Sequence, residues 1–299
     1  MKDKEKLNVG IVGGFQNGKS TFVNCMLDGL VARTGGDGIR VTSVNVKYMF
    51  GEIQRVEYYS NGYVIQTTTL NDFMQTKEFS PDISEARVSL WKPILRYVNI
   101  IDTPGFNAND ADTAMALSSL KGLDAAILVV NNIALSQPEI EIMNHLSVHG
   151  IPFYVIMNCL DKGGDSWNPQ SCFNEDKERI AVDTMHNRNF FPEKIEDKPI
   201  IRANFQWFWY ASEQFVQDEA GKREELEEEI SYYCKKQEKY GQEVRIDKTF
   251  FLNNSNLLPI RRYFDDERNW GFPMNCIRWK AEMEKIFISW ESQLQSILK

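Results

Sequence analysis

An eight-residue run near the start of the chain has the residue types and spacing of a phosphate-binding loop: Gly13-Gly14-Phe15-Gln16-Asn17-Gly18-Lys19-Ser20. Its glycines let backbone N–H groups turn inward around phosphate oxygens, and a helix predicted to start directly after the loop adds its dipole. Lys19 can reach the β- and γ-phosphates, and the Ser20 hydroxyl can bind Mg²⁺. We therefore expect a nucleoside triphosphate site with contacts from Gly13, Phe15, Gln16, Asn17, Gly18, Lys19, Ser20 and Thr21.

A second candidate loop, Asp102-Thr103-Pro104-Gly105, follows the apolar run 98–101. Four-residue loops with Asp and Gly are common turns, so the pattern gains its weight from its place at the end of a strand. A phosphate-binding protein of this kind needs a second carboxylate near Mg²⁺ at that place. We expect Asp102 to be associated with the metal and the N–H of Gly105 to face a γ-phosphate.

A third loop, Asn158-Cys159-Leu160-Asp161, follows the strand-like run 153–157. A carboxylate at Asp161 can accept hydrogen bonds from both N1–H and the 2-amino group of guanine, whereas adenine offers neither donor. All three loops would open at the carboxyl ends of strands, which is the ligand edge of a parallel sheet. The third loop therefore predicts a guanine nucleotide held by Asn158 and Asp161.

Short apolar strands alternate with helices around these loops, as in a parallel sheet with crossover helices. The predicted strands are 7–12, 97–101, 125–130, 151–157 and 199–201, and the predicted helices are 19–27, 110–120, 137–149 and 174–187. A strand at 44–48 and a hairpin at Ser60-Asn61-Gly62-Tyr63 predict an antiparallel edge. The expected fold is α/β: a doubly wound, mostly parallel sheet of the P-loop NTPase type with that edge and further helices toward the C-terminus.

The later part of the chain changes composition. We expect residues 1–270 to form one domain with a helical insertion at about 212–245, where Glu and Lys are dense, and a closing helix at 257–264. Residues 271–299 repeat apolar side chains at three- and four-residue intervals, which predicts an amphipathic helix. That helix would pack on the same chain, pair with a second subunit or bind a helical partner. The aromatic run 205–210 is expected to pack in the core rather than stack on a base or contact a membrane.

The overall charge of the 299-residue chain limits its partners. A formal net charge of −8 and a pI near 5.1 give no expectation of nucleic-acid binding and leave membrane binding open. The five cysteines are widely spaced without a paired motif, which is typical of reduced thiols. With no signal peptide or membrane-spanning run in the sequence, we expect a cytoplasmic location.

With these loops in this order, the chain resembles the translation-factor-related class of P-loop GTPases, and within it the bacterial dynamin-like proteins. The resemblance covers roughly residues 7–204 and is close at 12–24 and 100–106. It implies that Lys19, Gly105 and Gln16 assist hydrolysis together with Thr42, the expected switch I threonine, for which Thr34 is the alternative. It also implies Mg²⁺ held by Ser20, Thr42 and, through water, Asp102. The base would be held by Asn158 and Asp161, with Asn204 at its edge.

Two departures from the family pattern affect the expected affinity for the base and the expected rate of GTP hydrolysis. Cys159 replaces a lysine whose stem normally packs across the base, so base affinity or selectivity is expected to fall. Phe106 and Phe15 stand where glutamines orient water in related GTPases, and Gln16 and Asn17 are the nearest substitutes. The monomer is therefore expected to hydrolyse GTP slowly. We expect dimerisation across the nucleotide face, or a partner, to complete the site.

The leading hypothesis is a Mg²⁺-dependent GTPase that converts GTP to GDP and phosphate through positioning and charge neutralisation. One alternative is a regulatory GTP-binding switch or assembly module with negligible hydrolysis. Another is the GTPase-domain fragment of a membrane-remodelling dynamin-like protein. An ATP-using enzyme such as a kinase is disfavoured by the Asn158 and Asp161 pair.

Overall fold

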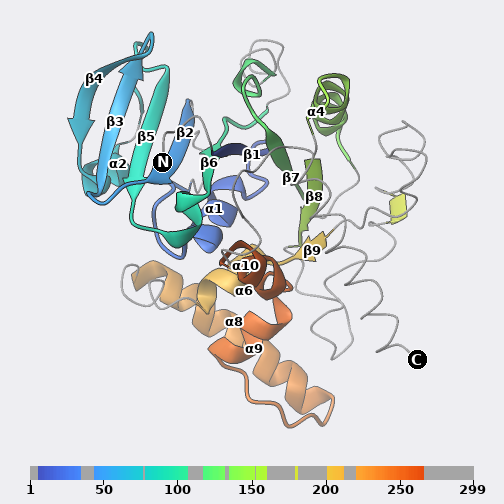
Figure 1. Ribbon diagram of the computed structural model, residues 1–299. Helices are drawn as coiled ribbons and strands as arrows, with labels where there is room; N and C mark the ends of the chain where they lie inside the picture. The colour runs from blue at the N-terminus through green and yellow to red at the C-terminus, as the bar shows by residue number, and fades with distance from the viewer. Residues whose placement is uncertain are drawn as a thin grey trace.

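A single nine-stranded sheet forms the centre of the molecule (Figure 1). The computed structural model describes residues 6–34, 44–76, 78–106, 117–131, 135–151, 153–159, 179–180, 201–211 and 220–265. Within them the strand order is β4-β3-β5-β2-β6-β1-β7-β8-β9. The strands are β1 (Leu7–Gly13), β2 (Asn45–Phe50), β3 (Arg55–Ser60), β4 (Tyr63–Thr68), β5 (Glu85–Leu90), β6 (Val98–Asp102), β7 (Ala125–Asn131), β8 (Phe153–Asn158) and β9 (Ile201–Ala203).

The half of the sheet from β6 to β9 is parallel, as predicted. β1 pairs with β6 on one side and β7 on the other, β7 pairs with β8, and β8 with β9. Their side chains are buried almost without interruption, because crossover helices cover such a sheet and leave no strand face to water. The carboxyl ends of β1, β6 and β8 therefore meet at one edge, where the three candidate loops begin.

The other half of the sheet is the antiparallel edge that alternation and turn residues predicted. β2 runs antiparallel to β6, and β3 runs antiparallel to both β5 and β4. Asn61 and Gly62 have φ of 49° and 84°, so the predicted hairpin turn between β3 and β4 is confirmed. β2 and β5 pair in parallel, however, a detail that local alternation does not indicate.

The helices are α1 (Lys19–Leu27), α2 (Leu70–Gln75), α4 (Gln137–Val148), α6 (Phe205–Tyr210), α8 (Ala220–Lys239), α9 (Lys248–Asn254) and α10 (Leu258–Asp265), with a 3₁₀ turn η2 at Pro93–Arg96. Figure 1 shows α6, α8, α9 and α10 grouped on one side of the molecule next to α1, with α4 apart from them. In this group α1 packs on α6 and α10, and α6 packs on α9. None of the described helices combines the length and apolar character needed to cross a bilayer.

The aromatic run 205–210 is confirmed as core packing. It forms α6, and its Trp207 ring contacts Tyr233 of α8 and Phe251 of α9. The Trp207 indole N–H also donates to Glu229 Oε1 at 3.0 Å, so one residue of the Glu-rich run in α8 is buried rather than solvated. The acidic helix is thereby anchored to the rest of the domain through an aromatic cluster.

Some predicted boundaries move by one or two residues. β6 ends at Asp102 rather than 101, and β8 runs from 153 to 158 rather than 151 to 157. The expected helices at 110–120 and 174–187 lie largely outside the described residues, as does the C-terminal amphipathic helix at 271–299. The division at residue 270 and the insertion at 212–245 stay predictions, although α8 supplies a helix within that insertion.

Candidate functional site

The backbone of the loop between β1 and α1 has a conformation that requires glycine at two positions. Gly13 has φ of 149°, and a Cβ there would lie 2.2 Å from the carbonyl oxygen of Val129. Gly18, the N-cap of α1, has φ of 90°, and its Cβ would lie 2.6 Å from Asn158 Nδ2. A side chain at either position would collide with a neighbouring strand. Packing therefore requires glycine at both positions, in addition to any need for a phosphate to approach the backbone.

Lys19 lies under this loop with only 7% of its surface exposed. Its Nζ donates a hydrogen bond to the carbonyl of Gly14 at 2.8 Å. Burial lowers the pKa of Lys19 to about 8, and the nearby Asp102 carboxylate opposes that shift. A buried cation at the start of a helix is suited to bind an anion that replaces its lost hydration.

Ser20 at the start of α1 and Asp102 at the end of β6 lie in contact. The Ser20 hydroxyl donates to Asp102 Oδ2 at 2.6 Å. Asp102 is 1% exposed, and burial raises its pKa to about 6 despite the opposing effect of Lys19. Its second oxygen, Oδ1, is buried without a hydrogen-bond partner among the described residues. An unsatisfied carboxylate oxygen beside a hydroxyl is a donor set of the type that Mg²⁺ prefers.

The segment after β6 lies directly against the phosphate loop. The Phe15 N–H donates to the Phe106 carbonyl at 3.0 Å, and the Thr103 hydroxyl donates to the Ile11 carbonyl at 2.9 Å. A Cβ on Gly105 would lie 2.8 Å from the Cα of Phe15 and 3.1 Å from the Nζ of Lys19. The structure thus places Gly105 beside the loop. The hydrogen bond from the Phe15 N–H to Phe106 was not indicated by the sequence.

Asn158 joins the third loop to the first. Its Nδ2 donates to the carbonyl of Asn17 at 3.2 Å, and its Oδ1 accepts the N–H of Phe205 at 3.4 Å. Cys159 is fully buried, and its N–H extends the β8–β9 pairing by donating to the Ala203 carbonyl at 2.7 Å. Asn158 therefore braces the loop between β1 and α1 from the end of β8.

Asn204, expected at the edge of the base, has another partner for its side chain. Its Oδ1 accepts the N–H of Trp207 at 3.0 Å and caps the first turn of α6. Its own N–H donates to the Ser255 carbonyl at 2.8 Å, and the residue is 2% exposed. Thr42 and Asp161 lie outside the described residues, so their roles stay predictions.

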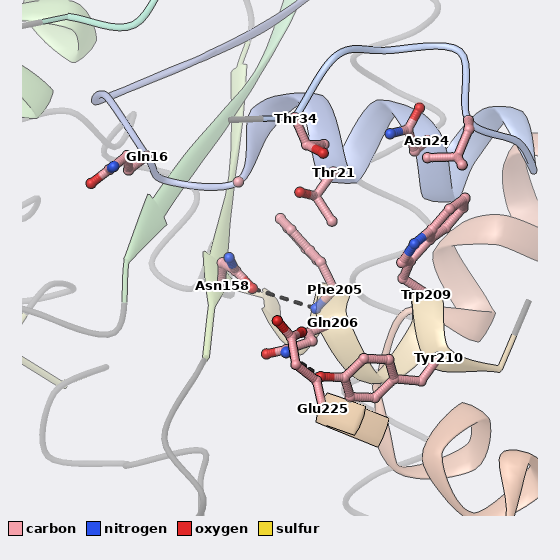
Figure 2. Close-up of a pocket in the computed structure, with 12 residues that line it drawn as sticks. Gln16, Thr21, Asn24, Thr34, Asn158, Phe205, Gln206, Trp209, Tyr210 and Glu225 are labelled. Carbon is pink, nitrogen blue, oxygen red and sulfur yellow. Dashed lines mark hydrogen bonds between the residues drawn. The ribbon is translucent and has the colours of Figure 1, made fainter. Parts of the chain in front are cut away.

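A cavity of about 230 Å³ opens between α1, the end of β8 and α6. Figure 2 shows Thr21 and Phe205 facing it, with Thr34 on the α1 side and Asn158 hydrogen-bonded to the N–H of Phe205. Gln16 is at the edge of this group, with its side chain directed away from it (Figure 2). The cavity adjoins the phosphate loop and the third loop, which is where a nucleoside would extend from bound phosphates.

One wall of the cavity comes from residues that the motifs did not identify. They belong to α6 and α8 and include Phe205, Gln206, Trp209, Tyr210 and Glu225. The Tyr210 hydroxyl accepts a hydrogen bond from Gln206 Nε2, and burial raises the pKa of Tyr210 well above its usual range. The only local signal was the aromatic run itself, which predicted core packing without indicating that one side lines a cavity.

The family model of the elongation factor Tu GTP binding domain matches residues 4–203, two thirds of the sequence. The chain belongs to this family. The GTP-binding domain is also 26% identical over 163 residues to Dynamin-like protein 2 of Campylobacter jejuni, covering 53% of this chain and 26% of that protein. The predicted likeness to bacterial dynamin-like P-loop GTPases and the expected binding of a guanine nucleotide are thereby confirmed.

Two solved structures are similar to this GTP-binding domain. A chain of an oligomerised bacterial dynamin pair matches 67% of this chain and 31% of its own length, with 18% identity and a TM-score of 0.48. Era in complex with MgGDPNP and part of 16S ribosomal RNA matches 67% of this chain and 51% of its own length, with 16% identity and a TM-score of 0.38. The domain therefore spans about a quarter of the curated relative and a third of the dynamin chain.

Proposed function

We propose that this GTP-binding domain hydrolyses GTP to GDP and phosphate in a Mg²⁺-dependent reaction. The observation that carries the proposal is the cluster of Lys19, Ser20 and Asp102, which places a buried cation, a hydroxyl and a carboxylate at the mouth of one loop. Membership of the GTP-binding family supports the substrate. Water would attack the γ-phosphate, and the protein would contribute positioning and charge neutralisation rather than a nucleophilic side chain.

The residues present fit a magnesium ion. Asp102 Oδ1 is buried without a partner among the described residues, and Ser20 Oγ lies beside the same carboxyl group. Ser20, Asp102 and the predicted switch I residue Thr42 would hold the ion, with Asp102 acting through water. When bound, Mg²⁺ would neutralise charge that develops on the phosphate oxygens.

The chain's own residues would complete the arrangement. The ammonium of Lys19 would exchange its bond to the Gly14 carbonyl for phosphate oxygens, and the N–H of Gly105 would contact the γ-phosphate. Asn158 would keep the third loop attached to the first while Asp161 reads the base. Gln16 has a left-handed backbone with φ of 61°, and we propose it as the residue nearest to a water-orienting role.

Hydrolysis by the isolated domain should be slow. Phe106 is 2% exposed, and its phenyl ring has no hydrogen-bonding group with which to orient water. Phe15 offers no polar group either. We propose that a second copy across the nucleotide face, or a partner, supplies the missing group. The domain would act in the cytoplasm and bind no nucleic acid.

Titration of the purified chain with fluorescently labelled GDP and labelled ADP, with and without Mg²⁺, tests the base and the metal together. We expect GDP to bind at least about tenfold more tightly than ADP, because only guanine offers two donors to the Asp161 carboxylate. Chelation of Mg²⁺ should weaken binding of a non-hydrolysable GTP analogue. Equal affinity for both bases would refute the base assignment, and indifference to chelation would refute the metal assignment.

Turnover measured across a range of protein concentrations tests the slow, dimer-stimulated reaction. The rate per molecule should rise with concentration, because the second copy completes the site only when it is bound. A flat but measurable rate would contradict dimer activation. Negligible turnover at every concentration, combined with tight GTP-dependent binding, would instead support a regulatory switch.

A further inference from the structure

Asn17 lies in the phosphate loop, but its side chain is bound by other parts of the domain. The residue is 4% exposed, and its Nδ2 donates to the carbonyl of Val129 in β7 at 2.9 Å. The same Nδ2 donates to Oε1 of Glu139 in α4 at 2.8 Å. Both amide hydrogens are therefore engaged by the neighbouring strand and helix, so this side chain has no hydrogen left for a phosphate.

Glu139 is a buried carboxylate that the proposed reaction does not use. It is 5% exposed, and its Oε2 accepts the backbone N–H of Ser136 at 2.7 Å and the hydroxyl of Ser136 at 2.9 Å. The bond from the Ser136 N–H is the glutamate half of the capping box at the start of α4. An ordinary capping box needs nothing from the rest of the fold, but here the other carboxylate oxygen, Oε1, binds the phosphate loop.

The charge of Glu139 does not explain why it is buried here. A carboxylate near a phosphate site repels the ligand, and its desolvation is unfavourable unless hydrogen bonds replace water. We therefore attribute the contribution of Glu139 to the hydrogen bonds that its two carboxylate oxygens make, not to its charge. The contact with Asn17 joins the loop to the first turn of a helix that is itself fixed by its cap.

The loop needs such a tether because its backbone is strained next to Asn17. Gln16, the residue before it, has φ of 61°. A left-handed conformation at a residue other than glycine is unfavourable and persists only when surrounding contacts hold it. Asn17 also accepts a hydrogen bond from Asn158 through its carbonyl, so it links β7, β8 and α4 to the loop.

We propose that Asn17 and Glu139 form a positioning pair, which holds the phosphate loop in the curvature needed for its backbone N–H groups to bind phosphate. The pair rests on the nucleotide site proposed above. It also makes α4 a mechanical support of that site, since displacement of the first turn of α4 would pull on Asn17. Neither residue needs to touch the nucleotide through its side chain.

The test compares two alanine substitutions on either side of Glu139. Asn17→Ala removes the tether and leaves the contacts between Glu139 and Ser136, whereas Ser136→Ala removes the hydroxyl bond to Glu139 Oε2 and leaves the tether. We expect Asn17→Ala to raise the Kd for labelled GDP about tenfold and to speed its dissociation, because one buried hydrogen-bonded partner is lost. Ser136→Ala should lower the melting temperature slightly and leave the Kd within about twofold of the native value.

Variants of Glu139 keep the inference testable if Asn17→Ala does not fold. Glu139→Ala should weaken GDP binding as Asn17→Ala does. Glu139→Gln should restore only part of the affinity, because its single amide oxygen can accept from Asn17 only when its NH2 group replaces the oxygen that accepts the Ser136 N–H. The double variant Asn17→Ala with Glu139→Ala should bind no worse than the weaker single variant, since the two residues act as one unit.

Two results would overturn the positioning pair. One is native GDP affinity in a folded Asn17→Ala or Glu139→Ala protein, and the other is equal loss of affinity in Ser136→Ala, which would show a general effect of helix stability. Failure of the native protein to bind any guanine nucleotide would instead refute the proposed function. GDP binding by the native protein therefore distinguishes failure of the positioning pair from failure of the proposed function.

Discussion

Lys19→Ala is expected to abolish measurable triphosphate binding, with a loss of affinity on the order of 100-fold or more. The side chain is 7% exposed, and its ammonium lies 2.8 Å from the Gly14 carbonyl inside the loop that would wrap the phosphates. Alanine removes the one cation that the loop offers at that place among the described residues. Because two phosphate groups would share this ammonium, both lose a charge-assisted hydrogen bond. Isothermal titration with GDP and a non-hydrolysable GTP analogue measures the loss.

A matched control uses Lys121, an exposed lysine at the end of the segment before β7. Lys121→Ala changes the net charge by the same amount, so it reports the general electrostatic effect, and its affinity should stay within about twofold of the native value. The melting temperature of Lys19→Ala must also be recorded. Unchanged GTP affinity in a folded Lys19→Ala protein would refute the assignment of this loop as the phosphate site.

Asp161→Asn is expected to exchange guanine for xanthine preference. The carboxylate of Asp161 would accept both N1–H and the 2-amino group of guanine, and an amide replaces one of these acceptors by a donor. Guanine then faces a donor with its amino group, whereas xanthine offers a carbonyl at the same position. We expect GDP affinity to fall on the order of 100-fold and xanthosine diphosphate to bind more tightly than GDP.

Asp161→Ala is the control for this exchange, because it removes the acceptors without adding a donor. It should weaken GDP binding and leave xanthosine diphosphate with no advantage. A competition titration with GDP, xanthosine diphosphate and ADP against one labelled nucleotide distinguishes these outcomes. If Asp161→Asn keeps the native preference for guanine, another group reads the base, and the wall formed by Gln206 and Tyr210 would be the next place to test.

Much of the site was accessible from the sequence because its chemistry is local. Lys19 and Ser20 follow a glycine at fixed spacing, and the structure confirms the strand before this loop and the helix that begins at Lys19. Asp102 and Gly105 were found by their position after an apolar strand, and they lie beside the same loop. A sheet of parallel strands brings such loops to one edge whatever their separation along the chain, which is why motif order was sufficient.

Other features depended on contacts that no local pattern encodes. Asn204 was expected at the base edge. In the structure its Oδ1 caps α6, because packing places this oxygen next to the N–H of Trp207. The cavity wall from α6 and α8 contains aromatic residues that are buried and also line the cavity, which the aromatic run alone does not indicate. The parallel pairing of β2 with β5 likewise follows from how the chain returns to the sheet, not from the alternation in either strand.

The sequence by itself therefore determined the family, and it predicted the phosphate loop and the order of the three loops proposed to face the ligand. These depend on residue type within a few positions, where glycine conformation, helix dipole and side-chain charge act directly. Only the tertiary structure decided that Asn17 binds a helix 122 residues further along the chain, and that Asn158 braces the loop through the Asn17 carbonyl. Such hydrogen bonds form only after the core has brought distant strands and helices together, so their partners cannot be chosen by local preference.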